Sequence, residues 1–340
     1  MKPSLYKDSG VDIQKADHLV SWLKSTESED SGDNTNSVVS GIGGFAALFR
    51  PDLRGFEDPV LVSSTDGVGT KVLLALEWGA LQCLGVDLVG MCVNDLYTVG
   101  GKPLFFLDYY ATGVLSRNQF SQVLSSIKEG LVQCDTALLG GETAELPGLY
   151  KKGHFDLAGF VVGIVDGNKI LKPESVKVGD VLIGLPSSGF HSNGFSLIRS
   201  WIEGKEVGTK LQENLLKPTR IYSEIPSLLK MSGKSIHGIA HITGGGLPGN
   251  VNRFLTKGKN AHIDGRKIPT PQWMSDFILE NTSSLADVFD VFNLGLGMVL
   301  AVESKDLDQV MQNACELGLS PVEIGEVRSS LGEGKEVIIS

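Results

Sequence analysis

The sequence has no block of basic residues and no long apolar run. Its 30 Lys and Arg are outnumbered by 40 Asp and Glu, which gives a formal net charge of −10 at pH 7. Nucleic acid and anionic membrane are therefore not expected as partners, because neither attracts an acidic protein. No stretch approaches the roughly 20 apolar residues that span a bilayer. Residues 1–10 also lack the apolar run of a signal peptide.

Cysteines and aromatic residues are also few. The 4 cysteines are scattered and form no Cys-x-x-Cys pair, so a reduced, cytoplasmic protein is the simplest interpretation. Aromatic residues make up only 7% of the chain, whereas glycine reaches 42 residues, which is well above average usage. Because glycine permits tight turns and a close approach of the backbone to ligands, we expect several sites lined by backbone.

The length and patterning of the chain indicate two domains. At 340 residues it exceeds the usual size of one hydrophobic core. Strand and helix patterns alternate in both halves without a repeat of fixed period, which indicates an α/β or α+β fold. The polar stretch 166–180 is the expected boundary, so we predict domains 1–169 and 170–340. Residues 24–37 contain no apolar side chain and should form a loop, either a plain linker or a lid.

Two glycine-containing segments flank the first predicted strand, 59–64, and are candidate phosphate sites. The segment 41–45 (GIGGF) precedes that strand, and a plain turn is its alternative interpretation. The segment 66–71 (DGVGTK) leads into a predicted helix, 71–78, whose free N–H groups and dipole favour anions. It is not a Walker A loop, and its alternative is that Asp66 caps the helix. The predicted phosphate ligands are Gly41, Gly43, Gly44, Gly67, Gly69, Thr70 and Lys71.

Acidic residues in apolar or glycine-rich surroundings suggest a metal site. Asp95 lies in a predicted helix, 85–99, that we expect to be buried nearly all round, where a lone carboxylate needs a cation. A structural salt bridge to Lys or Arg is the alternative. Glu142 follows two glycines after a predicted strand, 136–139. Because oxygen ligands from separate elements suit Mg²⁺, we predict a metal site formed by Asp66, Asn94, Asp95 and Glu142.

The second half contains a polar loop, 187–194, between a predicted strand, 181–185, and a predicted helix, 193–203. Its hydroxyls, imidazole and helix-start N–H groups suit a sugar phosphate or a proton transfer, and we expect its histidine to be exposed. The run 244–249 matches G-x-G-x-x-G only weakly, because the preceding IHGIAHIT is poor material for a buried Rossmann strand. A phosphate-binding turn fits better. The predicted substrate ligands are Ser188, His191, Ser192, Asn193, Gly244 and Gly245.

Together, these runs resemble the aminoimidazole ribonucleotide synthetase family (phosphoribosylformylglycinamidine cyclo-ligase) over nearly the whole chain. The most specific runs are 142–148 (ETAELPG) and 191–197 (HSNGFSL), which separate this family from its relatives. The other matching runs are 6–13, 41–45, 64–71, 87–96, 102–113, 240–247 and 292–298.

The resemblance implies an α/β (α+β) fold of two domains. The N-terminal sheets of two subunits would close a shared dimeric β-barrel, and the C-terminal domain would be an α/β sandwich. The resemblance also implies a homodimeric enzyme of purine synthesis that uses ATP and Mg²⁺. Its substrate would be formylglycinamidine ribonucleotide, and its products aminoimidazole ribonucleotide, ADP and phosphate. Lys24, His191 and His241 are the catalytic candidates.

The chain departs from the family in the segment after Lys24, where relatives often carry Lys and Arg. This chain has acids there instead, namely Glu27, Glu29, Asp30 and Asp33. Ala46 and Asn252 also replace a common glycine and proline. Selenophosphate synthetase, thiamine-phosphate kinase and the hydrogenase-maturation dehydratase are rivals that share the ATP site, but the 187–197 run fits none of them as well. A non-catalytic dimer that senses ATP is the alternative from another class.

Overall fold

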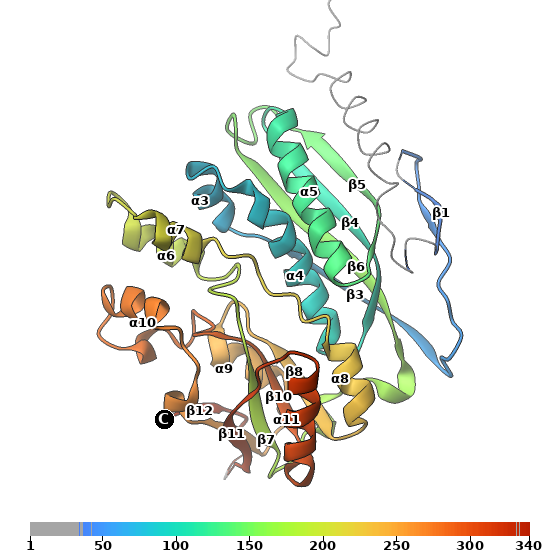
Figure 1. Cartoon of the computed structure of the whole chain (residues 1–340), viewed down its shortest axis with the longest axis vertical. Coiled ribbons are helices and arrows are strands. Elements are labelled where there is room, and N and C mark those ends of the chain that lie inside the picture. The colour runs from blue at the N-terminus through green and yellow to red at the C-terminus, as the bar shows by residue number, and fades with distance from the viewer. Residues whose placement is uncertain (1–33, 35–36, 42, 331, 333) are drawn as a thin grey trace, which may run out of the picture. The chain divides into compact units, whose positions relative to one another are not determined.

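The computed structural model describes residues 34, 37–41, 43–330, 332 and 334–340, and these belong to two compact units (Figure 1). The first unit comprises residues up to Val93 together with Pro103–Ile164, and the second comprises Asn94–Lys102 together with Val165–Ser340. The predicted division assigned residues 94–102 to the first domain, whereas in the structure they group with the second unit. No helix of the described residues is long and apolar enough to cross a membrane.

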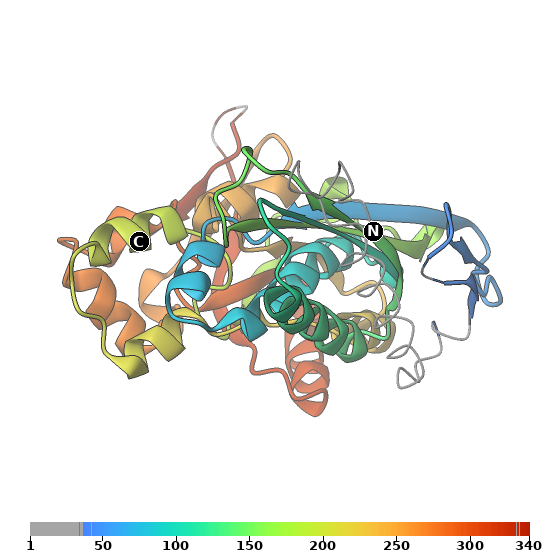
Figure 2. The ribbon, with the colours of Figure 1, turned by 90° about the horizontal axis from the view of Figure 1, so that it is seen from above.

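The first unit is built on a four-stranded sheet in the order β3-β6-β4-β5, and α4 and α5 lie over one face of it (Figures 1 and 2). A short antiparallel pair, β1 with β2, precedes the sheet. The strands are β1 Val38–Ser40, β2 Leu48–Phe49, β3 Pro59–Gly67, β4 Lys102–Thr112, β5 Ala137–Glu145 and β6 Phe155–Asp166. The helices are α3 Lys71–Glu77, α4 Leu84–Tyr97 and α5 Arg117–Gln133.

Small residues bring α4 and α5 together in the first unit. A Cβ on Gly85 would stand 2.1 Å from the Ile127 nitrogen, and one on Gly130 would stand 3.0 Å from the Val89 side chain. Because only glycine fits at such contacts, the two helices pack with their backbones close. Phe106, which is fully buried, comes from the sheet strand β4.

Two predicted strand ends differ from the structure. The predicted strand 136–139 continues to Glu145, because β5 pairs in parallel with β4 as far as Thr112↔Glu145, with an irregularity between Phe106 and Leu107. Glu142 therefore lies within a strand rather than after one. The strand predicted at 59–64 likewise continues through Asp66 to Gly67.

The second unit is built on a six-stranded sheet in the order β12-β9-β11-β7-β10-β8. The β7, β8, β9, β10 and β11 pairings are antiparallel, and β12 is parallel to β9. The strands are β7 Val181–Pro186, β8 Ile236–His241, β9 Lys259–Ile263, β10 Leu296–Val302, β11 Val322–Ser329 and β12 Val337–Ile339. The helices are α6 Phe195–Ile202, α7 Thr209–Leu215, α8 Ile225–Ser232, α9 Gly246–Val251, α10 Gln272–Leu279 and α11 Leu307–Glu316.

Strand β8 is buried along its whole length, although its two histidines made it poor material for a buried strand. Each imidazole reaches a carboxylate: His237 Nδ1 lies 2.9 Å from Asp180 Oδ2, and His241 Nδ1 lies 2.9 Å from Asp95 Oδ1. Because buried polar groups are tolerated when hydrogen-bonded, these pairs explain the discrepancy. The strand is antiparallel to β10, so it is not part of a Rossmann unit.

Candidate functional site

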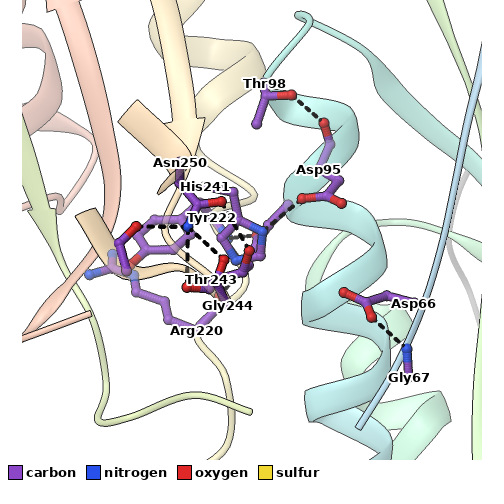
Figure 3. Close-up of polar contacts among 12 residues, drawn as sticks. Asp66, Gly67, Asp95, Thr98, Arg220, Tyr222, His241, Thr243, Gly244 and Asn250 are labelled. Atoms are coloured by element: carbon purple, nitrogen blue, oxygen red, sulfur yellow. Dashed lines mark hydrogen bonds and ion pairs between the residues drawn. The ribbon is translucent and has the colours of Figure 1, made fainter. Parts of the chain in front are cut away.

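Asp95 and His241 form a hydrogen-bonded pair in the second unit. The Asp95 carboxylate lies near the end of α4 and is turned toward the imidazole (Figure 3). Its side chain is 39% exposed, whereas the His241 side chain is only 1% exposed. Helix α4 is buried along its length, as expected, with Asp95 as the exception, so the inference that this carboxylate lies on a buried apolar face was wrong. The partner that the structure gives it here is a histidine, and the predicted metal contact stays a prediction.

Asn94 holds a segment of backbone with both ends of its amide. Its Oδ1 accepts the Tyr222 N–H at 3.0 Å, and its Nδ2 donates to the Arg220 carbonyl at 2.8 Å. The same Nδ2 lies 3.5 Å from His241 Nε2, which accepts when Nδ1 donates to Asp95. Asn94 is fully buried. These contacts give Asn94 a structural role, and its predicted metal contact stays a prediction.

His191 approaches the same backbone segment from the loop 187–194. Its Nε2 accepts the N–H groups of Ser188 and Arg220, both at 3.4 Å. The residue is fully buried and has a φ of 59°, a left-handed conformation that is uncommon outside glycine. The expectation that His191 is exposed was wrong, because the loop folds its imidazole inward onto residues 188 and 220.

Further contacts join the loop 187–194 to neighbouring segments. The Ser192 hydroxyl lies 3.3 Å from that of Thr219, and the Ser188 hydroxyl donates to the Pro218 carbonyl at 2.5 Å. Asn293 donates from Nδ2 to the Gly189 carbonyl at 2.8 Å. A Cβ on Gly297 would meet the Tyr222 hydroxyl at 1.8 Å, so the close approach of β10 to this segment depends on glycine.

The glycine run at 244–249 forms a turn that Asn250 stabilises. The Asn250 amide donates to the carbonyls of Thr243, Gly244 and Gly246 at 3.1, 3.2 and 2.8 Å. Gly245 has a φ of 93° and precedes the six-residue helix α9. A Cβ on Gly244 would lie 3.5 Å from Asn193 Oδ1, which places this turn beside the polar loop. The predicted substrate residues of the second half therefore lie close together.

Lys71 lies inside the first unit. Its ammonium is 2.7 Å from Asp87 Oδ2 and 2.9 Å from Oδ1, and both side chains are 0% exposed. The structure places this predicted phosphate cation in an interior ion pair between α3 and α4, and its phosphate contact stays a prediction. Asp66 Oδ1 instead accepts the Gly67 N–H at 2.7 Å (Figure 3). The N-cap of α3 is Thr70, so Asp66 does not cap this helix.

Gly41, Gly43 and Gly44, together with residues 45–47, line a cavity of about 630 Å³ in the first unit. The opposite wall comes from β4, β5 and β6 and includes Tyr109, Glu142 and Phe160. Gly41, Gly43 and Gly44 therefore share one hollow with the predicted metal ligand Glu142. Gly67, Gly69 and Thr70 are not part of this lining, and their phosphate contacts stay predictions.

Asp108 is a carboxylic acid in the interior of the first unit that the sequence reasoning passed over. Burial raises its pKa to about 7, and only its own backbone N–H acts to lower it. A Cβ on Gly141 would stand 2.2 Å from Asp108 Oδ1, so the glycine across the strand pair makes room for this side chain. A lone acid in the apolar run LFFLDYY was the signal that could have revealed it.

The described residues contain no group of three or more His, Cys, Asp and Glu side chains placed to hold a metal ion. Asp66 and Glu142 belong to the first unit, and Asn94 and Asp95 group with the second. Their joint metal site stays a prediction. Lys24 lies outside the described residues, as does nearly all of the predicted loop 24–37. Asn34 from that loop is described, and its amide donates to the carbonyls of Pro103 and Asp135.

Comparisons with known proteins identify both halves of the chain. Residues 45–165 match the AIR synthase related protein, N-terminal domain, and residues 177–337 match the corresponding C-terminal domain. A phosphoribosylformylglycinamidine cyclo-ligase of Finegoldia magna is 46% identical over 90% of this chain and 91% of the relative. One from Coxiella burnetii is 43% identical over 99% and 97%.

Solved structures show the fold. A thiamine-monophosphate kinase from Stenotrophomonas maltophilia has a TM-score of 0.64 at 19% identity, covering 95% of both chains. The hydrogenase maturation protein HypE has a TM-score of 0.65 at 16% identity, covering 86% of this chain and 87% of its own. These identities support a shared fold alone. The curated relatives are far more similar and span nearly the whole chain, so this chain belongs to the phosphoribosylformylglycinamidine cyclo-ligase family.

Proposed function

We propose that the protein closes an imidazole ring with ATP, converting formylglycinamidine ribonucleotide into aminoimidazole ribonucleotide in purine synthesis. The observation that carries this proposal is the 43–46% identity to cyclo-ligases of several bacteria over 90–99% of the chain. The thiamine-monophosphate kinase and the hydrogenase maturation protein are 19% and 16% identical to this chain, which supports a shared fold and not a shared activity.

The reaction needs ATP because an amide oxygen is a poor leaving group. Transfer of the γ-phosphoryl group to the formyl oxygen converts that oxygen into part of a phosphate ester. The amidine nitrogen then attacks the formyl carbon and closes the ring, the C–O bond breaks, and the oxygen departs with phosphate. ADP, phosphate and the imidazole are the products, and one proton leaves the attacking nitrogen.

In this proposal the second unit binds the ribonucleotide. Ser188, Ser192 and Asn193 offer hydroxyl and amide groups on one loop, and the turn at Gly244 and Gly245 lies beside it. The His241 imidazole is the candidate for moving a proton, because Asp95 orients it and fixes which nitrogen carries hydrogen. His191 accepts two backbone N–H groups through Nε2, so it is better suited to positioning the loop.

The cavity of the first unit is the proposed nucleotide site. Its glycine segment offers a backbone without side chains in the way, and its walls combine apolar surface with the carboxylate Glu142. Carboxylate oxygens such as those of Glu142, Asp66 and Asp95 are of the type that Mg²⁺ prefers. Mg²⁺ bound to the triphosphate would neutralise its charge, and it needs only one or two protein carboxylates there.

A homodimer through the first unit is the proposed assembly. The sheet of the first unit carries large exposed apolar side chains, including Leu61 at 67% exposure on β3 and Phe160 at 48% on β6. Gly159 faces Leu88 and Cys92 of α4, so its neighbour Phe160 points to the opposite face of the sheet. The β1–β2 pair adds exposed Val39 and Leu48. Apolar surface gathered on one sheet face is typical of a subunit interface. Pairing of two such faces would produce the shared barrel that the family resemblance implies.

The direct test supplies ATP, Mg²⁺ and the amidine ribonucleotide to the full chain and follows ADP and the imidazole product together. We expect one ADP for each imidazole formed. ATP consumption without imidazole, or with thiamine monophosphate as the acceptor, would refute the proposed activity. A protein that binds ATP and forms neither product would be the nucleotide-sensing dimer instead.

A further inference from the structure

We propose that Arg220 binds the phosphate monoester of the ribonucleotide, and that Asn94 and His191 position it for that purpose. This inference rests on the proposed function and adds to it the cation of the substrate site. The polar loop 187–194 and the turn at 244–245 carry no Lys or Arg. In a chain with a net charge of −10, a dianionic ligand at this loop needs a cation from elsewhere.

The backbone from Arg220 to Tyr222 is held at three groups by two fully buried side chains. Its N–H donates to His191 Nε2 at 3.4 Å, and its carbonyl accepts from Asn94 Nδ2 at 2.8 Å. The next fixed group is the Tyr222 N–H, which donates to Asn94 Oδ1 at 3.0 Å. Because a buried Asn and a buried His both hydrogen-bond to this one short segment, we infer that the position of the segment matters.

The arginine side chain is held in a definite place but is not enclosed. Its guanidinium carbon lies 5.1 Å from the centroid of the Tyr222 ring, and Nη2 lies 3.1 Å from Glu224 Oε1. The side chain is 27% exposed, so its remaining N–H donors can reach a ligand. Tyr222 is itself fixed, because its hydroxyl donates to the Pro186 carbonyl at 2.8 Å. An aromatic ring that packs against a guanidinium holds its N–H donors in position for a ligand.

The surroundings of Arg220 suit a phosphate monoester in particular. The same segment carries Thr219, whose hydroxyl faces that of Ser192, and Pro218, whose carbonyl accepts from Ser188. Arg220 therefore lies in the strip of chain that contacts the predicted substrate loop. A guanidinium binds phosphate oxygens in a bidentate manner, and neighbouring hydroxyls complete such a site. Glu224 already pairs with one guanidinium nitrogen of Arg220, so an incoming phosphate would compete with its carboxylate.

The contacts of His191 with this backbone also assign it a role that is compatible with its burial. Because both of its Nε2 contacts are backbone N–H donors, this nitrogen acts as an acceptor. His191 is then a positioning residue for Arg220 and Ser188.

The test measures binding of ribose 5-phosphate, inorganic phosphate and ADP to the full chain by calorimetry. We compare wild type with Arg220→Met, Arg220→Lys and Arg328→Met. Arg328 is the matched control, because it is also an arginine of the second unit paired with a nearby carboxylate, Glu326. We expect Arg220→Met to lower the affinity for ribose 5-phosphate at least about tenfold. Arg220→Lys should lower it less, since lysine keeps the positive charge but lacks the paired N–H donors of the guanidinium. The affinity of Arg328→Met for ribose 5-phosphate should stay within about twofold of the wild-type affinity, well below the tenfold change expected from the loss of one strong contact.

The same measurement can overturn the proposal. Unchanged affinity for ribose 5-phosphate in Arg220→Met, or no binding of it by wild type, contradicts the assignment. If only the affinity for ADP fell, Arg220 would be assigned to the ATP site instead. If only the affinity for inorganic phosphate fell, Arg220 would be assigned to binding the released phosphate. Failure of the wild type to form imidazole would refute the proposed function, while the ribose 5-phosphate titration would still decide the role of Arg220.

His191→Gln and His191→Ala test the positioning role as a matched pair, because both place a non-glycine residue at the same left-handed φ. Glutamine offers a side-chain oxygen acceptor to the two backbone N–H groups, and alanine does not. We expect the alanine variant to raise KM for the ribonucleotide more than it lowers kcat, with partial rescue by glutamine. Equal loss of kcat in both variants with KM unchanged would make His191 a catalytic residue instead.

Discussion

Asp87, Asp95 and Asp108 carry the same carboxyl group into three different surroundings. Asp87 faces the Lys71 ammonium in the interior, and Asp95 faces the His241 imidazole while staying partly in solvent. Asp108 is buried with only its own backbone N–H favouring the charged form. Because their surroundings differ, substitution of each carboxyl group is expected to have a different effect.

Asp108→Asn should stabilise the protein at alkaline pH. Burial raises the pKa of Asp108 from its ordinary value of 3.8 to about 7. Below about pH 4 the folded and unfolded chains both hold the proton; between pH 4 and 7 the unfolded chain releases it first, so stability falls as pH rises. Above pH 7 the loss reaches at most about 4 kcal/mol.

Thermal melts at pH 5 and pH 8 check this expectation. The Tm of Asp108→Asn relative to wild type should be higher at pH 8 than at pH 5. Asp58→Asn is the control, because Asp58 is exposed. A difference between Asp108→Asn and wild type that does not depend on pH would mean that Asp108 is ionised throughout.

Asp95→Asn should lower turnover by at least about tenfold, or roughly 1.4 kcal/mol of transition-state stabilisation. The amide keeps an oxygen that can accept from His241 Nδ1, so the fold should be little affected. A titration of activity with Mg²⁺ beside a thermal melt separates two roles. A weakened Mg²⁺ response supports the predicted metal contact, whereas lower turnover with an unchanged Mg²⁺ response assigns Asp95 to orienting His241. A much earlier melt with full activity would refute both.

The ion pair between Lys71 and Asp87 links α3 to α4. Two charges taken fully out of water add little net stability as a pair, but removing one partner leaves the other charge buried without this opposite charge beside it. Lys71→Met should therefore lower the free energy of unfolding by about 3–5 kcal/mol, measured by urea denaturation. The double variant Lys71→Met with Asp87→Leu should recover most of the lost free energy of unfolding.

The predicted phosphate role of Lys71 gives the opposite pattern. If Lys71→Met kept the stability of the wild type and lost only ATP affinity, the ammonium would act on the nucleotide rather than on Asp87. Calorimetric titration with ATP beside the urea curves distinguishes the two results.

The order of helices and strands was predictable wherever the apolar pattern and turn residues agreed. Helix α4, predicted at 85–99, forms at Leu84–Tyr97, and β7, predicted at 181–185, forms at Val181–Pro186. The sequence failed at Gly140–Glu142, because local glycines suggest a turn while pairing with β4 keeps the segment extended. Long-range pairing of that kind is not encoded in nearby residues.

The candidate site was predictable as a set of loops, but not in its connections. The polar loop 187–194 and the glycine turn at 244–245 were recognisable from their composition. The contacts of Asn94, His191 and Arg220 join residues about 30 to 130 positions apart, as in the separations of 29 and 126 for the two contacts of Arg220. No sequence period reveals such pairs, and Arg220 has no distinguishing neighbours in the chain.

At the scale of the whole molecule, the exposed sheet face of the first unit predicts a dimer. Leu61→Glu together with Phe160→Glu would place charges on that face and should yield monomers, because charged groups resist burial at a subunit interface. Light scattering after size-exclusion chromatography measures the mass. Val178→Glu is the control, since Val178 is equally open at 54% exposure but lies in the second unit. A wild-type monomer, or a dimer that survives both charges, would contradict the proposed interface.

The central claim is that the formyl oxygen of the substrate accepts the phosphoryl group and leaves with it. The most direct measurement uses the amidine ribonucleotide labelled with oxygen-18 in its formyl group and analyses the released phosphate by mass spectrometry. The proposed reaction predicts one labelled oxygen in each phosphate formed with the imidazole. Unlabelled phosphate, with the label recovered in water, would contradict it, because the oxygen would then have left without ever being phosphorylated.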